Sequence, residues 1–527
     1  MSEMSGRPGE DNAEATSKPD PRTDSHDTSG GYIDTRSLED AHIGARIAAE
    51  HLQHHRYTGP FGWMWFDGRR WTPVPETSVA EVVRQALIQM HVTEAQAGAD
   101  ADRLKRLSSL FSAAKIRNVV YIAKLRCTTT EEFDAHPDLL NVGNGVVSLR
   151  DGTLLPHDPA LMLTKLAPVD YVPGAVHADW GQALAALPNA EAVDWLQVRL
   201  GQGLTGHPTP DDRLVLFKGS GANGKTTVVD AVRHAAGDDY AVTMPERVLL
   251  ARTSDHPTEL MTLRGARLAL MEEFPELGHL NVKRLKDLHG TGRMSARYCG
   301  KDTVHWSPSH TAFVTTNYLP RVDESDMGTW RRLSLLDFPY RYCRSSDEIR
   351  TAFDRIGDPS LRERLRHGDD GQPEAVLAWL VAGAVRWYRG GRVMPQDPDC
   401  VRETTEKWRR TSDLLMRYLD DRLVFDADAY VVSAELFEDF TDWLKSSGHR
   451  AWSDQNFTAR FAQHSEVADH DVTKKVVRRT RSGHLSRPPS KLVPGSTGRP
   501  LSKQFTAWLG VRFHTDGDFE ETTDEQA

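Results

Sequence analysis

The sequence predicts an α/β fold that is built on a parallel sheet. The apolar run 213–219 (RLVLFKG) is typical of a buried parallel strand, and it leads directly into the phosphate-loop pattern G-x-x-x-x-G-K-[ST]. Residues 226–237 (TTVVDAVRHAAG) then continue with helical spacing up to a glycine. Further strand candidates alternate with helices at 240–245 (YAVTMP), 267–273 (RLALMEE), 311–317 (TAFVTTN) and 331–339 (RRLSLLDFP). We therefore expect about five parallel strands with helices on both faces, in a domain spanning residues 179–345.

The composition is that of an ordinary globular protein, with 39% apolar and 27% charged residues among 527. No stretch reaches the ~18 to 20 apolar residues of a membrane span, so we expect no membrane partner. The N-terminus lacks the apolar core of a secretory signal, and the four cysteines show no C-x-x-C spacing. These features predict a protein of the cytoplasm without a zinc site or a disulfide framework.

The residues before this domain divide into a polar tail, expected to be disordered over 1–40, and a mixed α+β domain over 41–178. That domain opens with helical spacing at 40–57 and continues with an aromatic hairpin around Asp67-Gly68 and further helices. Its last part, 139–159 (LLNVGNGVVSLRDGTLLPHDP), alternates Asn and Gly turns with short apolar runs. This alternation is typical of a small β-rich unit.

Beyond the sheet we expect a helical segment over 346–420, a winged-helix-like domain over 421–515 and an acidic tail over 516–527. The order strand, helix, helix and two basic strands indicates the winged helix. Residues 472–503 carry nine Lys or Arg side chains and no carboxylate, which is the charge pattern of a DNA-binding surface. The candidates for DNA contact are Lys474, Lys475, Arg478 and Arg479.

The phosphate loop supplies the residues that we expect to bind ATP. Its glycines let backbone N–H groups converge on phosphate oxygens, Lys225 offsets the charge of the β- and γ-phosphates, and Thr226 ligates Mg²⁺. A chance match is the alternative, but the loop stands between a strand and a helix, which is the context that the motif requires. The expected ATP contacts are Gly219, Ser220, Gly221, Ala222, Asn223, Gly224, Lys225 and Thr226.

Polar and charged residues beside the later strands predict the rest of the site. Glu272 and Glu273 follow an apolar strand, where one carboxylate can hold hydrated Mg²⁺ and the next can polarise an attacking water. Asn317 ends another strand and could orient that water. Arg331 and Arg332 precede the last strand, and an arginine supplied to a neighbouring subunit's ATP stabilises transition-state charge. Taken singly, each of these residues is also typical of a solvated strand end or turn.

Taken together, four segments resemble the superfamily 3 helicases, and specifically the helicase part of phage and plasmid primase-helicases. They are GSGANGKTT, RGARLALMEEF, LKDLHGTGRMSARYCGKDTVHWSPSHTAFVTTNYLP and DMGTWRRLSLLDFPYRY. The resemblance implies an AAA+-like ATPase that forms a hexameric ring around single-stranded DNA and moves along it 3′ to 5′. It assigns Glu272 to the metal, Glu273 to water activation and Asn317 to sensing the γ-phosphate. Arg332, with Arg331 as second choice, is the finger that acts on the adjacent subunit.

The resemblance also concerns two lysines and the residues ahead of the ATPase. MSARYCGKDTVHW falls where the family carries a β-hairpin that projects into the channel, with Lys301 at its tip. Lys286 corresponds to a family lysine that reaches either nucleotide or DNA. The segment 139–159 is similar to the domain that precedes this helicase. Primer-making members carry a large catalytic domain further upstream, and because only the tail 1–40 stands there, we expect no primer synthesis.

These observations predict an ATP-dependent DNA helicase of phage or plasmid replication, in the cytoplasm of a bacterial cell or a phage-infected host. Its expected partners are single-stranded and forked DNA, further copies of itself, and a separate primase or replication initiator. One alternative is an origin-binding or helicase-loading ATPase without unwinding activity. The other is a P-loop small-molecule kinase, which would need neither the acid pair nor the basic C-terminal strands.

Overall fold

The computed structural model describes residues 37–250, 257–275, 278–290, 292–297, 303–322, 327–449, 451–478 and 504–514. The internal contacts of the chain define two compact units, Met1–Trp65 with Pro73–Thr130 and Phe66–Thr72 with Glu131–Ala527. Most of the predicted tail 1–40 and all of the tail 516–527 lie outside the described residues. No described helix has the length and apolar character needed to cross a membrane.

The first unit is a cluster of helices joined to a β-hairpin. Its helices are α1 (Asp40–His51), α2 (Glu76–Gln96), α3 (Ala101–Ser109) and α4 (Ala113–Cys127), and its strands are β1 (His55–Thr58) and β2 (Gly62–Phe66), with β3 (Trp71–Pro73) at the junction between the units. The side chains of Asp100 and Ser112 accept hydrogen bonds from the first turns of α3 and α4, which explains where these helices begin. Ile47 of α1 and Val119 of α4 are buried in the same apolar core.

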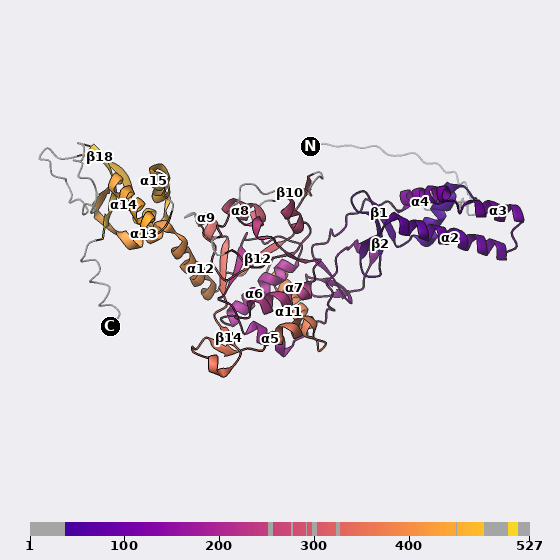
Figure 1. Ribbon diagram of the computed structural model, residues 1–527, viewed down its shortest axis with the longest axis horizontal. Coiled ribbons are helices and arrows are strands. Elements are labelled where there is room, and N and C mark those ends of the chain that lie inside the picture. The colour runs from indigo at the N-terminus through magenta and orange to yellow at the C-terminus, as the bar shows by residue number, and fades with distance from the viewer. Residues whose placement is uncertain are drawn as a thin grey trace, which may run out of the picture. The chain divides into compact units, whose positions relative to one another are not determined.

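A five-stranded parallel sheet forms the core of the second unit (Figure 1), which confirms the predicted fold class. Its strands are β7 (Leu214–Lys218), β8 (Ala241–Thr243), β9 (Leu268–Met271), β12 (Thr311–Thr316) and β13 (Leu333–Asp337). They lie in the order β13-β7-β12-β9-β8, and every neighbouring pair is parallel. Residues that follow β7, β9 and β12 therefore emerge at one common edge of the sheet.

Different helices cover the two faces of this sheet, as the alternation of its side chains requires. Val215 and Phe217 of β7 point into a core shared with α6 and α11, whereas Leu214 and Leu216 point into the opposite core, which Trp408 also enters. The covering helices are α6 (Ala190–Leu204), α7 (Lys225–Ala236) and α11 (Gln372–Arg389) on the first face, and α8 (Val282–Gly290) and α12 (Asp399–Ser412) on the second.

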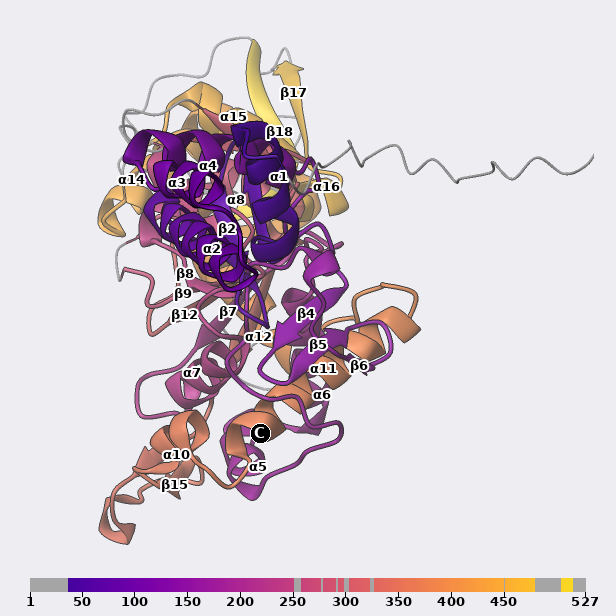
Figure 2. The ribbon, with the colours of Figure 1, turned by 90° about the vertical axis from the view of Figure 1, so that its right-hand side faces the viewer.

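Helices α6 and α11 lie side by side (Figure 1 and Figure 2) because two glycines let their backbones meet. A Cβ atom added to Gly383 would lie 2.0 Å from the carbonyl oxygen of Gln197, and one added to Gly201 would lie 2.2 Å from the backbone nitrogen of Ala384. No side chain fits at either position. The pair packs closely against one face of the sheet.

Residues 131–178 pack with the sheet, although the sequence-based boundary placed them in the N-terminal domain. Strands β4 (Leu139–Val142), β5 (Gly145–Ser148) and β6 (Leu154–Leu155) form an antiparallel sheet, so the expected β-rich unit is present. Leu140 and Val147 are buried in the same core as α6 and α7. The turn pattern identifies such strands, but it does not reveal what their apolar side chains pack against.

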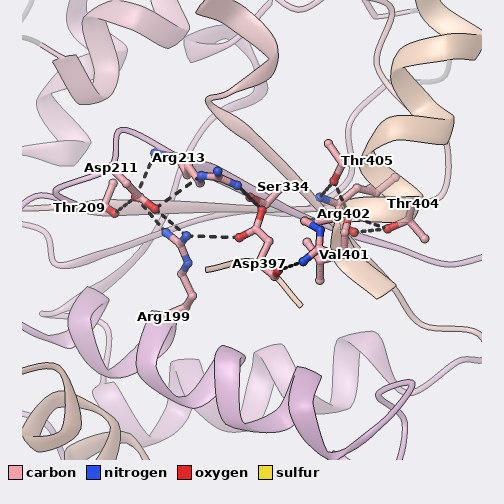
Figure 3. A network of polar contacts seen from close by, with 11 residues as sticks. Arg199, Thr209, Asp211, Arg213, Ser334, Asp397, Val401, Arg402, Thr404 and Thr405 are labelled. Carbon is pink, nitrogen blue, oxygen red and sulfur yellow. Dashed lines mark hydrogen bonds and ion pairs between the residues drawn. The ribbon is translucent and has the colours of Figure 1, made fainter. Parts of the chain in front are cut away.

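A buried polar network ties together the amino-terminal edge of the sheet (Figure 3). Arg199 of α6, whose side chain is 1% exposed, donates hydrogen bonds of 2.9 and 2.6 Å to the two carboxylate oxygens of Asp211. Ser334 of β13 donates to Asp397 at 2.8 Å, and Arg213 pairs with the same carboxylate. The pairing compensates charges that would be costly to bury alone. The network therefore holds β13, the residues before β7 and those before α12 in one arrangement.

The segment 346–420, expected to be helical, mainly completes the two cores of the sheet. Its strand β15 (Asp354–Ile356) pairs in parallel with β14 (Arg341–Cys343), which lies just before the segment, and α10 (Leu361–His367), α11 and α12 follow. Leu365 of α10 is buried beside α7 in the first core, and Trp408 of α12 is buried in the second. The sequence predicted these helices, but their apolar stripes do not show whether they pack on the sheet or on one another.

The C-terminal region has the winged-helix-like order that the sequence predicts. Its elements are α13 (Leu414–Arg422), β16 (Leu423–Val432), α14 (Ser433–Ser446), α15 (Asp454–Gln463), α16 (Ser465–Asp469), β17 (Thr473–Arg478) and β18 (Gln504–Phe513). The strands form an antiparallel sheet in the order β16-β18-β17. Phe440, Phe461 and Trp508 form its core, to which Tyr418 of α13 also belongs.

The remaining described elements are short. They are α5 (Ala178–Leu184), β10 (Met294–Ala296), β11 (Val304–Trp306), α9 (Met327–Trp330) and the 3₁₀ turns η1 (Pro159–Leu161), η2 (Glu246–Val248), η3 (Pro257–Leu263) and η4 (Ser346–Glu348).

Candidate nucleotide-binding site

The phosphate loop connects the end of β7 to the start of α7, as its motif predicts. Gly221 and Gly224 have φ angles of 100° and 81°, which glycine adopts without strain, and Ala222 between them has a φ of 48°. A Cβ atom added to Gly219 would lie 1.4 Å from Nδ2 of Asn223. The loop therefore curls around the N-terminus of α7, whose backbone N–H groups favour an anion.

The side chain of Lys225 lies between β7 and β12. Its Nζ donates to the carbonyl oxygens of Gly219 at 3.2 Å and Thr316 at 2.9 Å, and to Oδ1 of Asn317 at 2.9 Å. Lys225 is only 6% exposed, and this burial lowers the pKa of its amino group, which the nearby carboxylate of Glu273 partly offsets. All three partners of the Lys225 amino group are uncharged oxygens, and phosphate oxygens can replace them as hydrogen-bond acceptors.

Asn317 and Glu273 extend this contact to the next strand. Nδ2 of Asn317 donates to Oε1 of Glu273 at 3.1 Å. Glu273 has a φ of 61°, and its backbone N–H donates to the hydroxyl of Thr315 at 3.3 Å. A left-handed φ at a non-glycine residue costs about 1 to 3 kcal/mol and is often found at functional sites. The structure thus brings together the expected sensor, the expected water-activating acid and the phosphate-loop lysine.

Glu272, the expected metal ligand, makes a different contact. Its side chain is 60% exposed, and Oε1 lies 3.0 Å from Nη1 of Arg233 on α7. Glu272 and Thr226 line the same cavity. Motif reasoning missed Arg233, since it lies on the helix after the loop, where arginine is an ordinary surface residue.

One cavity of about 550 Å³ joins these residues, a volume within the usual range of ~300 to 1,000 Å³ for ligand pockets. Arg362 and Arg366 of α10 also line this cavity. The sequence motifs did not indicate either arginine. Arg362 pairs with Asp230 of α7. The only signal was the arginine-rich run LRERLRH, which no motif marks. The lining residues are Lys225, Thr226, Val229, Asp230, Arg233, His234, Asp238, Glu272, Glu273, Thr315, Thr316, Asn317, Arg362 and Arg366.

The oxygen ligands around this cavity fit Mg²⁺ that is bound together with a nucleotide. No group of three or more His, Cys, Asp or Glu in the described part of the chain could hold a metal ion by itself. Mg²⁺ in phosphate-transfer sites is usually held by one or two protein oxygens, substrate phosphates and water. The Thr226 hydroxyl and the Glu272 carboxylate can supply the ligands that come from the protein.

Arg331 and Arg332 lie at the opposite edge of the sheet from the phosphate loop. In the parallel register of β13 and β7, Leu333 pairs with Leu214 and Asp337 with Lys218, so the strands separate the two edges by about 15 Å. Arg332 is mostly buried, with a side chain 13% exposed, and it contacts the carbonyl oxygen of Gly328 at 2.6 Å and Asp212 at 3.4 Å. Arg331 is exposed. Neither arginine is positioned to reach its own subunit's phosphate loop.

The expected DNA contacts of the central domain are only partly described. Strands β10 and β11 pair antiparallel, as expected for the predicted hairpin, whereas Lys301 at its tip lies outside the described residues. Lys286 is half-buried on α8 and does not line the 550 Å³ cavity. The structure therefore separates Lys286 from the expected nucleotide contacts.

The C-terminal candidates lie on β17, an edge strand of its sheet. Lys475 and Arg478 are exposed, and Lys474 contacts the hydroxyl of Thr458 at 3.1 Å and lies over the ring of Trp508. Arg479 lies outside the described residues. Described residues 473–478 thus present three cations on one exposed strand.

Two family models match the chain. The model "D5 N terminal like" matches residues 44–197, and the model "Poxvirus D5 protein-like" matches residues 410–486. Together they confirm the resemblance to primase-helicases, for an N-terminal and a C-terminal stretch on either side of the phosphate loop.

Similar proteins occur in large DNA viruses. A protein of African swine fever virus named as a "putative primase" is 24% identical over 365 residues, which are 66% of this chain and 37% of that protein. A protein of Acanthamoeba polyphaga mimivirus named as a "putative helicase" is 25% identical over 272 residues, which are 49% of this chain and 27% of that protein. The chain thus spans only 37% and 27% of the length of these two relatives.

Among solved structures, the apo C-terminal region of NrS-1 aligns with 84% of this chain and 88% of its own, at 11% identity and a TM-score of 0.42.

Proposed function

We propose that this chain is an ATP-dependent DNA helicase of phage or plasmid replication, which moves on single-stranded DNA as a ring and hydrolyses ATP between subunits. The observation that carries the proposal is the contact of Lys225 with Asn317 and of Asn317 with Glu273. It joins three motifs that are far apart in the sequence at the edge of the sheet where nucleotides bind. The viral relatives named as helicase or primase support a role in replication.

Each residue of this edge has a role in the proposed hydrolysis. Lys225 holds the β- and γ-phosphates, and Glu273 polarises the water that attacks the γ-phosphate. Asn317, which contacts both side chains, orients that water. Thr226 and Glu272 would hold Mg²⁺, which neutralises charge on the phosphates when bound.

The position of the twin arginines supports hydrolysis between subunits. Because Arg331 and Arg332 lie at the edge of the sheet opposite the phosphate loop, they can serve only the ATP of another copy. Of the two, the exposed Arg331 has the freedom to reach a neighbour, whereas Arg332 is tied to Gly328 and Asp212. The proposal therefore makes Arg331 the finger, in place of Arg332 as first expected. It keeps the hexamer that the resemblance implies as the assembly.

The exposed cations of β17 support an interaction with DNA. Lys475 and Arg478 are suited to phosphate contacts because neither is buried, and such contacts hold a protein on DNA without regard to its sequence. We place Lys301 and Lys286 in the same role, in the channel of the ring. The proposal includes a cytoplasmic location and a separate primase or initiator as partner.

An origin-binding or helicase-loading ATPase is the second candidate, because it would use the same nucleotide site and the same basic strand. It differs only in what hydrolysis achieves. A loader would hydrolyse ATP on DNA without separating strands, and a forked substrate distinguishes the two.

The rate of ATP hydrolysis with and without single-stranded DNA tests the proposal against the P-loop kinase. We expect DNA to stimulate hydrolysis by the full chain, and Lys225→Ala to abolish hydrolysis in both conditions. A DNA-independent rate together with phosphate transfer to a small molecule would support the kinase and overturn the proposal.

A further inference from the structure

A second, smaller cavity also borders the phosphate loop. It has a volume of about 170 Å³ and shares no lining residue with the larger cavity. Ala222 and Gly224 of the loop and Thr227 of α7 form one wall, and Tyr342 and Leu361 face them. The cavity is smaller than the ~300 Å³ or more of pockets that enclose whole ligands, so it suits one part of a ligand.

The order of the strands indicates which part of a nucleotide would reach this cavity. Strand β7 lies between β12, which Asn317 follows directly, and β13, which leads to Tyr342. Lys225, Asn317 and Glu273 fix the γ-phosphate on the β12 side. Thr227 lies one residue beyond Thr226, about 100° further around α7, and so on another face of the helix. A nucleotide whose γ-phosphate lies at Asn317 therefore extends past Thr227 toward Tyr342.

The ring of Tyr342 is held in place against the loop. Its backbone N–H donates to the carbonyl oxygen of Ala222 at 2.7 Å. A Cβ atom added to Gly224 would lie 3.3 Å from Cε2 of Tyr342 and 2.8 Å from Cβ of Ala186, so the loop backbone lies directly on both side chains. Burial raises the pKa of the Tyr342 hydroxyl, and the guanidinium of Arg355 lies beside it. The aromatic ring thus forms a fixed wall of the cavity.

Asp358 and Gln182 are among the polar side chains that line the cavity, and they differ in their hydrogen-bonding state. The carboxylate of Asp358 already accepts hydrogen bonds from the hydroxyl of Ser360 and the guanidinium of Arg364, both at 2.7 Å. Gln182, after the first turn of α5, is exposed. A glutamine amide offers a donor and an acceptor side by side, which is the pattern that pairs with adenine.

We propose that this cavity binds the base of the nucleotide, with the Tyr342 ring stacked on it and the Gln182 amide paired with its edge. Because that amide matches adenine and the Asp358 carboxylate is engaged, the site prefers ATP to GTP. This assignment rests on the proposed function, since it takes the phosphates to lie at Lys225. It adds the contacts that select the nucleotide.

Isothermal titration of the full chain with ATP, GTP and inorganic tripolyphosphate tests the proposal, because tripolyphosphate lacks the base. Stacking on an aromatic side chain accounts for a roughly 5- to 150-fold change in affinity per base. We therefore expect Tyr342→Ala to weaken ATP binding by about that factor and to leave tripolyphosphate binding unchanged. The backbone hydrogen bond to Ala222 remains in this variant, so the loop keeps its support.

Two further variants separate the contacts. Tyr342→Phe keeps the ring and should bind ATP like the wild type, and Gln182→Leu should reduce the preference for ATP over GTP. The proposal is overturned if Tyr342→Ala binds ATP as well as the wild type does, or if it loses ATP and tripolyphosphate equally. A wild-type chain that binds neither ATP nor tripolyphosphate would instead contradict the proposed function, and the base site with it.

Discussion

The amino group of Lys225 lies 2.9 Å from Oδ1 of Asn317, although 92 positions separate the two residues in the sequence. The same amide donates to Glu273, so Asn317 joins the phosphate loop to the acid that follows β9. In the proposed function this amide lies between the group that holds the γ-phosphate and the group that activates water. Hydrolysis then depends on all three side chains, and binding mainly on the first.

Glu273→Gln should retain ATP binding and lose most hydrolysis. The glutamine keeps an oxygen that can accept from Asn317, but it cannot polarise a water as a carboxylate does, and such groups contribute about 10²- to 10⁴-fold. Binding is measured by titration calorimetry and hydrolysis by phosphate release. Glu272→Gln is the matched control, for which we expect a higher Mg²⁺ requirement. Unchanged hydrolysis by Glu273→Gln would remove this residue from the mechanism.

Arg331→Ala should lose ATP hydrolysis, whereas Arg332→Ala should lose thermal stability. Because Arg331 is exposed, its loss should leave thermal unfolding unchanged while lowering hydrolysis by about 10³-fold, the lower range for an arginine finger. Arg332→Ala should lower the unfolding temperature, since it removes the contacts to Gly328 and Asp212. Mixing inactive Arg331→Ala with inactive Lys225→Ala subunits should restore part of the hydrolysis. No recovery in mixtures would contradict a site shared between subunits.

Lys475→Ala combined with Arg478→Ala should weaken DNA binding and reduce its salt dependence. Each lost phosphate contact lowers the slope of log affinity against log salt by about 0.9 for duplex DNA, so the double variant should lower it by about 1.8. Lys445→Ala is a control with an exposed cation of the same region, which pairs with Asp442. Fluorescence anisotropy at several salt concentrations measures the slope. A double variant with the wild-type slope would show that β17 does not contact DNA.

Two buried histidines should make the protein less stable in mild acid. Burial lowers the pKa of His289 to about 3 and that of His310 to about 4, from 6.5. The unfolded chain binds protons below pH 6.5 that the folded chain excludes. The free energy of unfolding therefore keeps its highest value above pH 6.5 as far as these histidines are concerned. As the pH falls toward 4, it decreases by about 1.4 kcal/mol per pH unit for each histidine.

Urea unfolding between pH 7.5 and pH 4.5 measures this slope. The His310→Gln variant should show a shallower decline than the wild type, whatever its stability at pH 7.5. Parallel curves for the two proteins would contradict the assignment of this pH dependence to His310.

The sequence predicted the parallel sheet and the phosphate loop because both leave local patterns. A buried strand ending in glycines and a lysine is visible in the order of residues, and so is an apolar strand that ends in Glu272 and Glu273. The same reasoning could not place residues 131–178 or the helices α10 and α11. Their apolar stripes are compatible with several partners, and only the folded chain shows that they complete the core of the sheet.

Sequence motifs pointed to some of the residues that line the 550 Å³ cavity, but not to all of them. Arg233 and Arg362 lie on helices and are ordinary charged residues in the sequence, but the fold aims them into the cavity beside Glu272. Tyr342 was missed because its contact with the phosphate loop is made through a backbone N–H, which no residue type reveals. The sequence did not reveal that Arg332 is mostly buried against Asp212, since a sequence does not show which of two adjacent arginines faces inward.

Strand displacement on a forked DNA is the measurement that tests the central claim most directly. The wild-type chain should release the displaced strand only with hydrolysable ATP, and Lys225→Ala should bind the fork but release nothing. Wild-type protein that hydrolyses ATP on this fork without releasing a strand would contradict the helicase assignment and favour a loader. Release by Lys225→Ala would contradict the nucleotide site itself.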